Sequence, residues 1–314
     1  MNHLRIVSPS ERAPDVLRVL EGSPSVVNVI HLPNAARSPK GDVILCDVAR
    51  EDTSVIVGEL RRLGLEHGGS IALEEVDTEL SDAGREATKL AAGAPADAVV
   101  WEQVEERTSE SAELSINFLV FMIVATLIAA AGILTDSQVL IIGAMVVGPE
   151  FGPLAGFCVA VVERRLELAR RSLLALAVGF PLAILATAAM TEVLQWAGPA
   201  PETVEATSRP ATYFISHPNT FTVIVALLAG VAGMLSLTTA KSGALVGVLI
   251  SVTTIPAAAN VGVAAAYSDW VEFRGALAQL SLNLVSIVCA GIATLLLQRV
   301  GFARRVRAAA RRGQ

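Results

Sequence analysis

Long charge-free stretches are the feature that most constrains how this chain folds. Each contains about 20 or more mostly apolar residues, the length that an α-helix needs to cross the ~30 Å hydrocarbon core of a bilayer. A further stretch of the same length carries one charged residue, Glu150. The sequence therefore predicts a polytopic α-helical membrane domain with six spans: Leu114–Leu134, Val139–Val162, Ser172–Thr191, Pro218–Ala240, Ser242–Ser268 and Gly275–Gln298.

The charged residues of the chain are distributed unevenly. The first 113 residues carry 11 Lys and Arg against 21 Asp and Glu, whereas the remaining 201 carry 13 against 9. One solvent does not suit both parts, so an acidic soluble domain is expected before the membrane domain. This composition excludes a purely soluble enzyme. The acidic front part also argues against nucleic-acid binding, which needs a basic face to meet phosphates.

The soluble part, residues 1–78, alternates strand and helix patterns in the order βαββαβ. Strands are expected at Leu4–Ser8, Val26–Leu32, Asp42–Ala49 and Ser70–Val76, and helices at Pro9–Glu21 and Glu51–Leu63. This order predicts a small α+β ferredoxin-like domain. Its residues show no phosphate loop, metal cluster or pair of nucleophile and base, so an oligomerisation or packing role is favoured over ligand-dependent regulation.

Residues 79–113 are expected to form a linker followed by an interfacial amphipathic helix, with Trp101 as a candidate membrane-surface anchor. The N-terminus lacks the apolar core of a secretory signal, so the soluble domain is expected in the cytoplasm. Short cytoplasmic loops hold the Lys and Arg of membrane proteins. The arginines after the second span and those of the tail, residues 301–314, then fall on the same side as the N-terminus. A multi-pass protein of the bacterial cytoplasmic (inner) membrane with both termini inside is predicted.

The membrane domain, residues 114–300, contains a weak internal repeat. The segment that starts at Phe118 and the one that starts at Phe221 both read as an apolar span, a short polar turn and an interrupted second span. Each repeat has three spans, so the second copy is inverted relative to the first. Paired interrupted helices in inverted repeats are typical of transporters, whose binding sites lie at the bilayer midplane.

The two interruptions contain the candidate pathway residues. In the first, two prolines and two glycines make a continuous helix improbable and free backbone groups for a solute or ion. In the second, Pro256 is expected to act in the same way, with polar neighbours. The glycine spacing also suits close helix packing, which is the alternative explanation for the glycines. The candidate residues are Gly148, Pro149, Glu150, Gly152, Pro153, Thr253, Thr254, Pro256 and Asn260, joined by Asn283 of the last span.

Glu150 is the most conspicuous candidate because no other formally charged residue lies well inside a predicted span. An ionised carboxylate at that depth costs at least ~2.5 kcal/mol, so Glu150 is expected to face a cavity, find a partner or bind a proton. Proton coupling through Glu150 is one hypothesis, and a structural hydrogen bond is the alternative. Gln279, Asn283 and Ser286 share one helix face, which either borders the pathway or bonds to a neighbouring helix.

The segment IGAMVVGPEFGPLAG, together with the later segments SVTTIPAAANVGVA and QLSLNLVSIVCAG, resembles the prokaryotic hydrophobic-domain family described as domain of unknown function 389. The resemblance covers roughly the membrane half and implies its architecture, since the family brings no established activity. Members commonly have Ser at the position of Gly148 and Leu-Met at that of Glu150-Phe151. The carboxylate is therefore a departure from the family pattern.

These observations favour a membrane transporter or channel for a small solute or ion, with the soluble domain regulating or assembling it. The alternative is a non-transporting membrane sensor or scaffold whose soluble domain binds a ligand or partner. No motif of an intramembrane enzyme, no cofactor motif and no metal-ligand spacing is present, so neither catalysis nor a cofactor is expected. The expected partners are the lipid bilayer, the unidentified solute or ion and further copies of the chain in a homo-oligomer.

Overall fold

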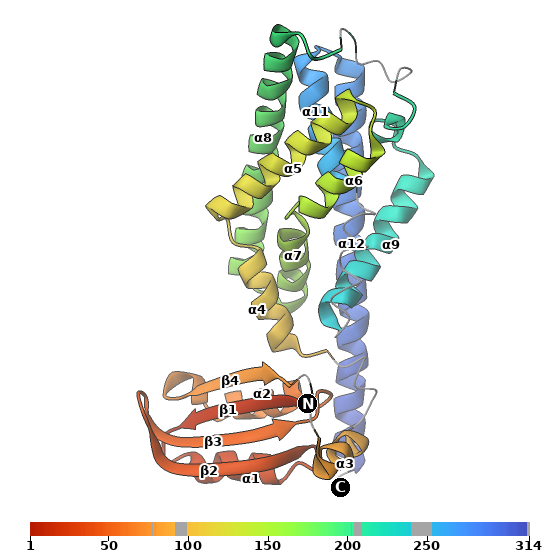
Figure 1. Cartoon of the computed structure of the whole chain (residues 1–314). Coiled ribbons are helices and arrows are strands. Elements are labelled where there is room, and N and C mark those ends of the chain that lie inside the picture. Colours follow the sequence, from red (N-terminus) through yellow and green to blue (C-terminus); the bar gives the residue numbers. More distant parts are fainter. Residues whose placement is uncertain are drawn as a thin grey trace. The chain divides into compact units, whose positions relative to one another are not determined.

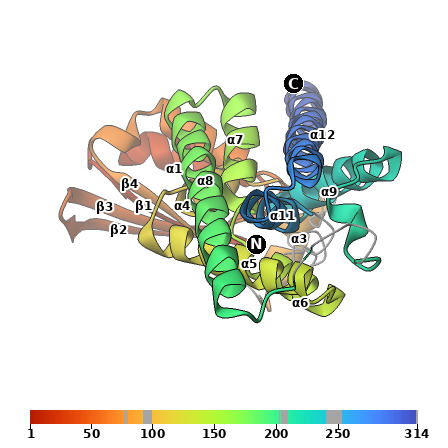
Figure 2. The same ribbon diagram turned by 90° about the horizontal axis from the view of Figure 1, so that it is seen from above.

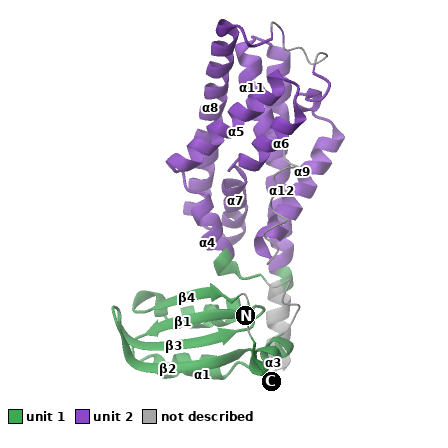
Figure 3. Ribbon diagram, viewed as in Figure 1, with its two compact units in different colours: residues 1–103, 300–314 green, residues 104–299 purple. Residues whose placement is uncertain are grey.

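The computed structural model describes residues 1–76, 78, 80–91, 99–201, 203, 209–239 and 253–312, with side chains as far as Gly301. The chain divides into two compact units (Figure 3). Unit 1 contains Met1–Gln103 together with Val300–Gln314, and unit 2 contains Val104–Arg299. Helices α4 and α12 each contribute residues to both units.

Unit 1 has the predicted element order β1-α1-β2-β3-α2-β4. Its four strands form one antiparallel sheet in the order β2-β3-β1-β4 (Figure 1). The largest difference from the prediction is in β2, which continues beyond the predicted end at Leu32 to Arg37. The bounds are β1 Asn2–Ser8, α1 Ala13–Glu21, β2 Val26–Arg37, β3 Lys40–Val48, α2 Thr53–Arg62 and β4 Ser70–Glu75.

The core of unit 1 lies between the sheet and its two helices. Alternate residues of β1, such as Leu4 and Ile6, are fully buried because successive side chains of a strand point to opposite faces. They pack in one cluster with Val16 of α1 and Leu60 of α2, so both helices cover the same face of the sheet. This arrangement matches the ferredoxin-like topology predicted from the element order.

Asp42, at the start of β3, ties the loop after β1 to strand β2. Its Oδ1 accepts hydrogen bonds from the Ser10 hydroxyl at 2.6 Å and the Asn34 backbone N–H at 3.0 Å, and its Oδ2 lies 2.7 Å from His31 Nε2. The hydrogen bonds from Ser10, Asn34 and His31 hold the pKa of Asp42 at about 2, below its ordinary value. His31 is thus the partner of a carboxylate.

The segment predicted as a linker contains a helix. α3, Asp82–Leu90, begins where the Ser81 hydroxyl accepts a hydrogen bond from the Gly84 backbone N–H, a standard N-cap. α4, Trp101–Ser111, corresponds to the predicted interfacial helix. The first described residues after the linker belong to unit 1, because the Trp101 backbone N–H donates to the Ser54 hydroxyl of α2.

Unit 2 is built of apolar helices. Four of them are long and apolar enough to cross a membrane: α5, α8, α9 and α12. Helices α6 and α7 pass the same test together and are bent by 49° at the break between them, a geometry that fits either one broken span or a re-entrant loop. The bounds are α5 Ile116–Leu134, α6 Gln138–Val147, α7 Phe151–Glu163, α8 Leu166–Ala197, α9 Thr220–Thr238, α11 Thr254–Ala266 and α12 Trp270–Arg312, with a 3-10 turn, η4, at Tyr213–Ile215.

The described residues support four or five spans of the six predicted. The fifth predicted span, Ser242–Ser268, is described from Thr253 onward, and residues 240–252 lie outside the described part. The described part of this span is α11, which has 13 residues. A helix of this length extends about 20 Å, less than the hydrocarbon thickness.

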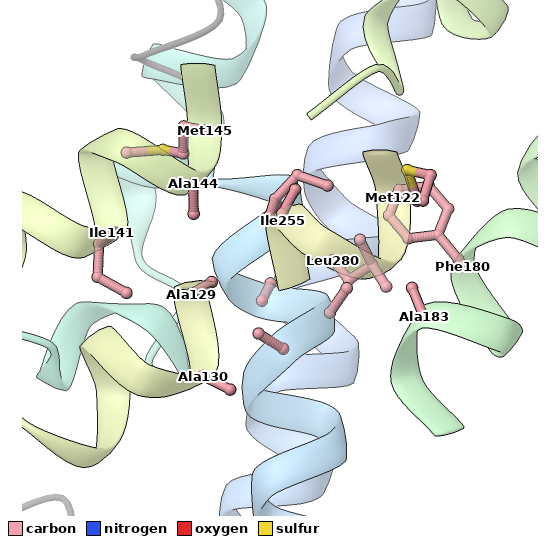
Figure 4. Close-up of a cluster of buried hydrophobic side chains, with 14 of the residues drawn as sticks. Met122, Ala129, Ala130, Ile141, Ala144, Met145, Phe180, Ala183, Ile255 and Leu280 are labelled. Carbon is pink, nitrogen blue, oxygen red and sulfur yellow. The ribbon is translucent and has the colours of Figure 1, made fainter. Parts of the chain in front are cut away.

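Helix α11 is nevertheless the most enclosed element of unit 2. Every residue from Thr254 to Ala264 is buried. It lies against α5, α6 and α8, and Figure 2 shows it among the other helices of this unit. Its Ile255 belongs to the apolar cluster that contains Ile141 and Met145 of α6 and Leu280 of α12 (Figure 4). This packing fixes the N-terminal end of α11 close to the end of α6.

Candidate functional site

The first predicted interruption is present, and the structure shows how it is built. Helix α6 ends at Val147, with Gly148 as its C-cap, and α7 begins at Phe151 with Glu150 as its N-cap. Pro149 lies between the helices, and Pro153 lies in the first turn of α7. Proline has no backbone N–H and is tolerated in the first turn, where that group has no intrahelical acceptor. The prolines therefore end one helix and begin the next.

The second interruption differs from the prediction. Pro256 does not break a helix, because it occupies the first turn of α11, which then continues without interruption to Ala266. Thr253 is the N-cap, so the helix begins before Pro256 and is not interrupted at this proline. The two segments are alike in one respect: Pro153 and Pro256 each stand three residues after the N-cap of their helix.

The beginnings of α7 and α11 meet at Glu150. The Thr254 hydroxyl of α11 donates a hydrogen bond of 2.6 Å to Glu150 Oε1, across 104 positions of sequence. Both residues are buried, with 3% of Glu150 and none of Thr254 exposed. Oε2 of Glu150 is buried as well and accepts no hydrogen bond from any residue that the structure describes. The carboxylate thus has a hydroxyl group as its partner, and this hydroxyl donates to one of its two oxygens.

Gly148 provides the space for this carboxylate. A Cβ atom on Gly148 would lie 2.4 Å from Glu150 Oε2 and 2.6 Å from Cγ1 of Ile255, both closer than real contacts allow. A glycine is required here by the close approach of α11. The packing explanation for the glycines is also correct at Gly152 and Gly156, where an added Cβ would lie 2.8 Å from the Ser111 carbonyl oxygen and the Ser172 hydroxyl, respectively.

Helix α12 joins the same group of polar side chains. Gln279 Nε2 and Asn283 Nδ2 donate hydrogen bonds of 3.2 Å and 2.8 Å to the Thr253 hydroxyl. Both residues are 2% exposed. The shared face of α12 therefore bonds to a neighbouring helix, as one of the two hypotheses predicted. Gln279 Oε1 is buried and, like Glu150 Oε2, accepts no hydrogen bond from the described residues.

Asn260 belongs to a different cluster. It lies six residues after Thr254, about 9 Å along the axis of α11. Its Nδ2 donates to Glu272 Oε2 at 3.3 Å, and its Oδ1 accepts from Arg209 Nη1 at 3.5 Å. Arg209 Nη2 also lies 3.6 Å from the same oxygen of Glu272. The side chains of Arg209 and Glu272 are 9% and 7% exposed, so this is a buried ion pair.

The chain segment that carries Arg209, residues 209–217, is held at several points. Asp136, between α5 and α6, accepts hydrogen bonds from the backbone N–H groups of Ala211 and Thr212 and from the Thr212 hydroxyl. Ile215 is buried in the apolar cluster. The Ser216 carbonyl oxygen packs so closely on α12 that a Cβ atom added to Gly275 would lie 2.1 Å from it. This "Arg209 segment" therefore packs against the end of the bundle formed by the α5–α6 and α11–α12 connections.

The comparisons with known proteins concern the same region. Residues 145–289 match the family described as Domain of unknown function (DUF389). The match covers 145 of the 314 residues, a little under half of the chain. The resemblance seen in the sequence is thereby confirmed, and the matched DUF389 segment includes all ten candidate pathway residues.

One relative of the chain is an uncharacterized protein, MJ0678, of Methanocaldococcus jannaschii. It is 26% identical over 189 residues, which are 60% of this chain and 56% of the relative, so the match spans little more than half the relative's length. No solved structure matches the chain.

Sequence reasoning found part of the candidate site and missed part of it. The predicted residues Glu150, Thr253, Thr254 and Asn283 are brought together, with Gln279 as a further member. Asn260 is not among them, because it bonds to Arg209 and Glu272. Those two charged residues lie between the predicted spans, where an exposed position is normal. The only available signal was that Arg209 is a single arginine in a loop that otherwise carries acidic residues.

Proposed function

We propose that this chain is a membrane transporter or channel for a small solute or ion, with its binding site at the junction of α6, α7, α11 and α12. The observation that carries the proposal is the buried contact between Glu150 and Thr254. It joins the first residues of two helices inside a bundle whose core cluster is apolar. An anchor has no need of a carboxylate at this cost, whereas broken helices with polar ends are how transporters build midplane sites.

The proposed architecture has six spans in two inverted repeats of three. The similar starts of α7 and α11, each with a proline three residues after the N-cap, support this repeat. The chain would lie in the bacterial inner membrane with both termini in the cytoplasm. The soluble domain would regulate or assemble it, and homo-oligomers are expected.

In this proposal the Arg209 segment closes one side of the site. The buried ion pair between Arg209 and Glu272 links that segment to the helix that also carries Gln279 and Asn283. Access to Glu150 from this side would require the segment to move. Loops that cover a site and move on microsecond to millisecond timescales are common in transport and catalysis.

The burial of Glu150 and Thr254 is the observation that favours the second candidate, a non-transporting membrane sensor or scaffold. If the junction stays dry in every state, it contributes packing and rigidity and carries no solute. The two candidates therefore differ in whether water reaches the junction.

Cysteine accessibility measures this difference without knowledge of the substrate. In a background where Cys46, Cys158 and Cys289 are replaced by alanine, Thr254→Cys and Asn283→Cys would be treated in proteoliposomes with membrane-impermeant thiol reagents. Labelling of both variants, from either side, is expected for a transporter or channel. Ala129→Cys, in the fully buried apolar cluster, is the matched control and should remain unlabelled. If the junction cysteines are as unreactive as the control, the transporter proposal is refuted.

A further inference from the structure

We infer that the junction binds a small monovalent metal cation of the alkali class, held by Glu150 Oε2 and Gln279 Oε1. This inference rests on the proposed function and names the class of ion that the site takes. The starting observation is that these two buried oxygens accept no hydrogen bond from the residues that the structure describes. A buried polar atom without a partner is costly, so each such atom calls for a ligand.

Both oxygens are acceptors, and their side chains are anchored by two adjacent residues, Thr253 and Thr254. Glu150 is fixed by the Thr254 hydroxyl, and Gln279 is fixed by the hydroxyl of Thr253. The Thr253 hydroxyl oxygen already accepts two hydrogen bonds, from Gln279 and Asn283, so its lone pairs are used. The Thr254 hydroxyl donates to Glu150 and keeps lone pairs for a ligand. The group offers carboxylate, amide and hydroxyl oxygens, which are the ligands of hard cations.

The charge of the junction favours a ligand with a single positive charge. Glu150 is the only ionisable side chain in the sequence from Gln138 to Leu154, and neither α5 nor α11 has an ionisable side chain. Helices α7, α8 and α12 also pack around the junction, but the charged side chains that the structure describes on them lie toward the helix ends. These are Glu163, Glu167, Arg170, Arg171, Glu192, Glu272, Arg274 and Arg299. One cation of charge +1 would neutralise the junction and remove the cost of the buried carboxylate.

The helix ends at the break add a further contribution. Helix α6 ends at Val147, beside the Gly148 position against which Glu150 Oε2 lies. The last carbonyl groups of a helix lack intrahelical partners and form the negative end of its dipole. Carbonyl oxygens at the ends of broken helices coordinate cations in transporters. The beginnings of α7 and α11 oppose a cation with about half an elementary charge each, but the end of α6 offsets one of them, so the full charge of Glu150 leaves the junction net negative.

The test is a titration of the full-length protein in detergent with LiCl, NaCl or KCl, with N-methyl-D-glucamine chloride added to keep the ionic strength constant. A cation that binds only the folded state raises the unfolding temperature in proportion to the logarithm of its concentration above Kd. We expect this logarithmic rise with at least one alkali cation. The rise should disappear in Glu150→Gln. In Gln279→Ala the Kd should be at least about tenfold weaker.

Ser286→Ala is the matched control, because Ser286 is buried on the same face of α12 but lies seven residues beyond Gln279. It should titrate like the unmodified protein. If Glu150→Gln does not fold, the binding of radioactive sodium, potassium or rubidium to the unmodified protein decides, with one ion per chain expected. The inference is overturned if no alkali cation binds. It is also overturned if the unfolding temperature responds to pH but to none of the three alkali chlorides, or if Gln279→Ala binds as tightly as Ser286→Ala.

The outcomes separate this inference from the proposed function. Alkali-cation binding combined with unreactive junction cysteines would retain the cation site and refute transport. Reactive junction cysteines without alkali-cation binding would retain transport and refute the cation site.

Discussion

The ion pair between Arg209 and Glu272 should make a large contribution to the stability of unit 2. Both side chains are less than one-tenth exposed, and Glu272 Oε2 also accepts a hydrogen bond from Asn260. Replacing Glu272 by glutamine keeps the shape but leaves a buried guanidinium without this opposite charge. Breaking a buried pair by removing one partner costs ~3–5 kcal/mol. We expect Glu272→Gln to lower the free energy of unfolding by this amount.

A second ion pair in unit 2 is the matched control. Glu163 Oε1 lies 3.3 Å from Arg299 Nη1, which is shorter than the 3.6 Å between Glu272 and Arg209. Its side chains are 26% and 47% exposed, however, and exposed pairs contribute only ~0–1 kcal/mol. Glu163→Gln should therefore have a small effect. If distance decided the energy, the order of the two variants would be reversed.

Hydrogen exchange of the full-length protein in nanodiscs, followed by mass spectrometry, measures where the free energy is lost. A loss of 3 kcal/mol corresponds to about a 150-fold increase in an opening equilibrium constant. This increase should appear in peptides from the Arg209 segment, residues 209–217, because the ion pair holds that segment. The double variant Arg209→Met with Glu272→Leu should recover most of the loss. Equal, small effects of Glu272→Gln and Glu163→Gln would refute the reasoning from burial.

Three further predictions concern other parts of the chain. Gly148→Ala should destabilise the protein by ~1–3 kcal/mol through the clash at Glu150, whereas Gly143→Ala, whose Cβ meets nothing within 4 Å, should be neutral or stabilising in denaturant unfolding in mixed micelles. Thr254→Val should cost ~1–3 kcal/mol in the same assay, because it removes the hydroxyl that Glu150 accepts from; an unchanged midpoint would contradict this. The folded-state pKa of Asp42, about 2, is below the unfolded value, so its contribution is present above about pH 4 and is lost as pH falls toward 2. Hydrogen exchange in β3 of the full-length protein should show this acid-dependent loss, and Asp42→Asn should abolish it.

The soluble fold could be predicted in most of its detail because its signals are local. Alternating apolar residues define the strands, and the buried positions of β1, such as Leu4 and Ile6, follow from a period of two. The long extension of β2 to Arg37 was not predicted, because the exposed residues beyond Leu32 show no such alternation. Helix α3 was missed for a related reason. It is short and largely polar, so its residues resemble a linker in composition.

The membrane helices were predictable from hydropathy, but the identity of polar partners was not. The prolines and glycines place the break of α6 and α7 correctly, since two of each within six residues leave no continuous helix. Hydropathy does not contribute to this. It says nothing about which helix faces Glu150. That partner, Thr254, is 104 positions away and is selected by the packing of Ile255 among α5, α6 and α12.

The pairing of Arg209 with Glu272 is a second case in which the polar partner could not be predicted, here because both residues lie outside the apolar stretches. In sequence, a charged residue outside an apolar stretch is assigned to water, because that assignment is correct for most loops. The Arg209 segment is an exception because Asp136 satisfies its backbone N–H groups and Ile215 contributes apolar burial. With the backbone satisfied, the guanidinium can enter the bundle and reach Glu272 and Asn260. A buried charge in a membrane protein can therefore come from a connection as well as from a span.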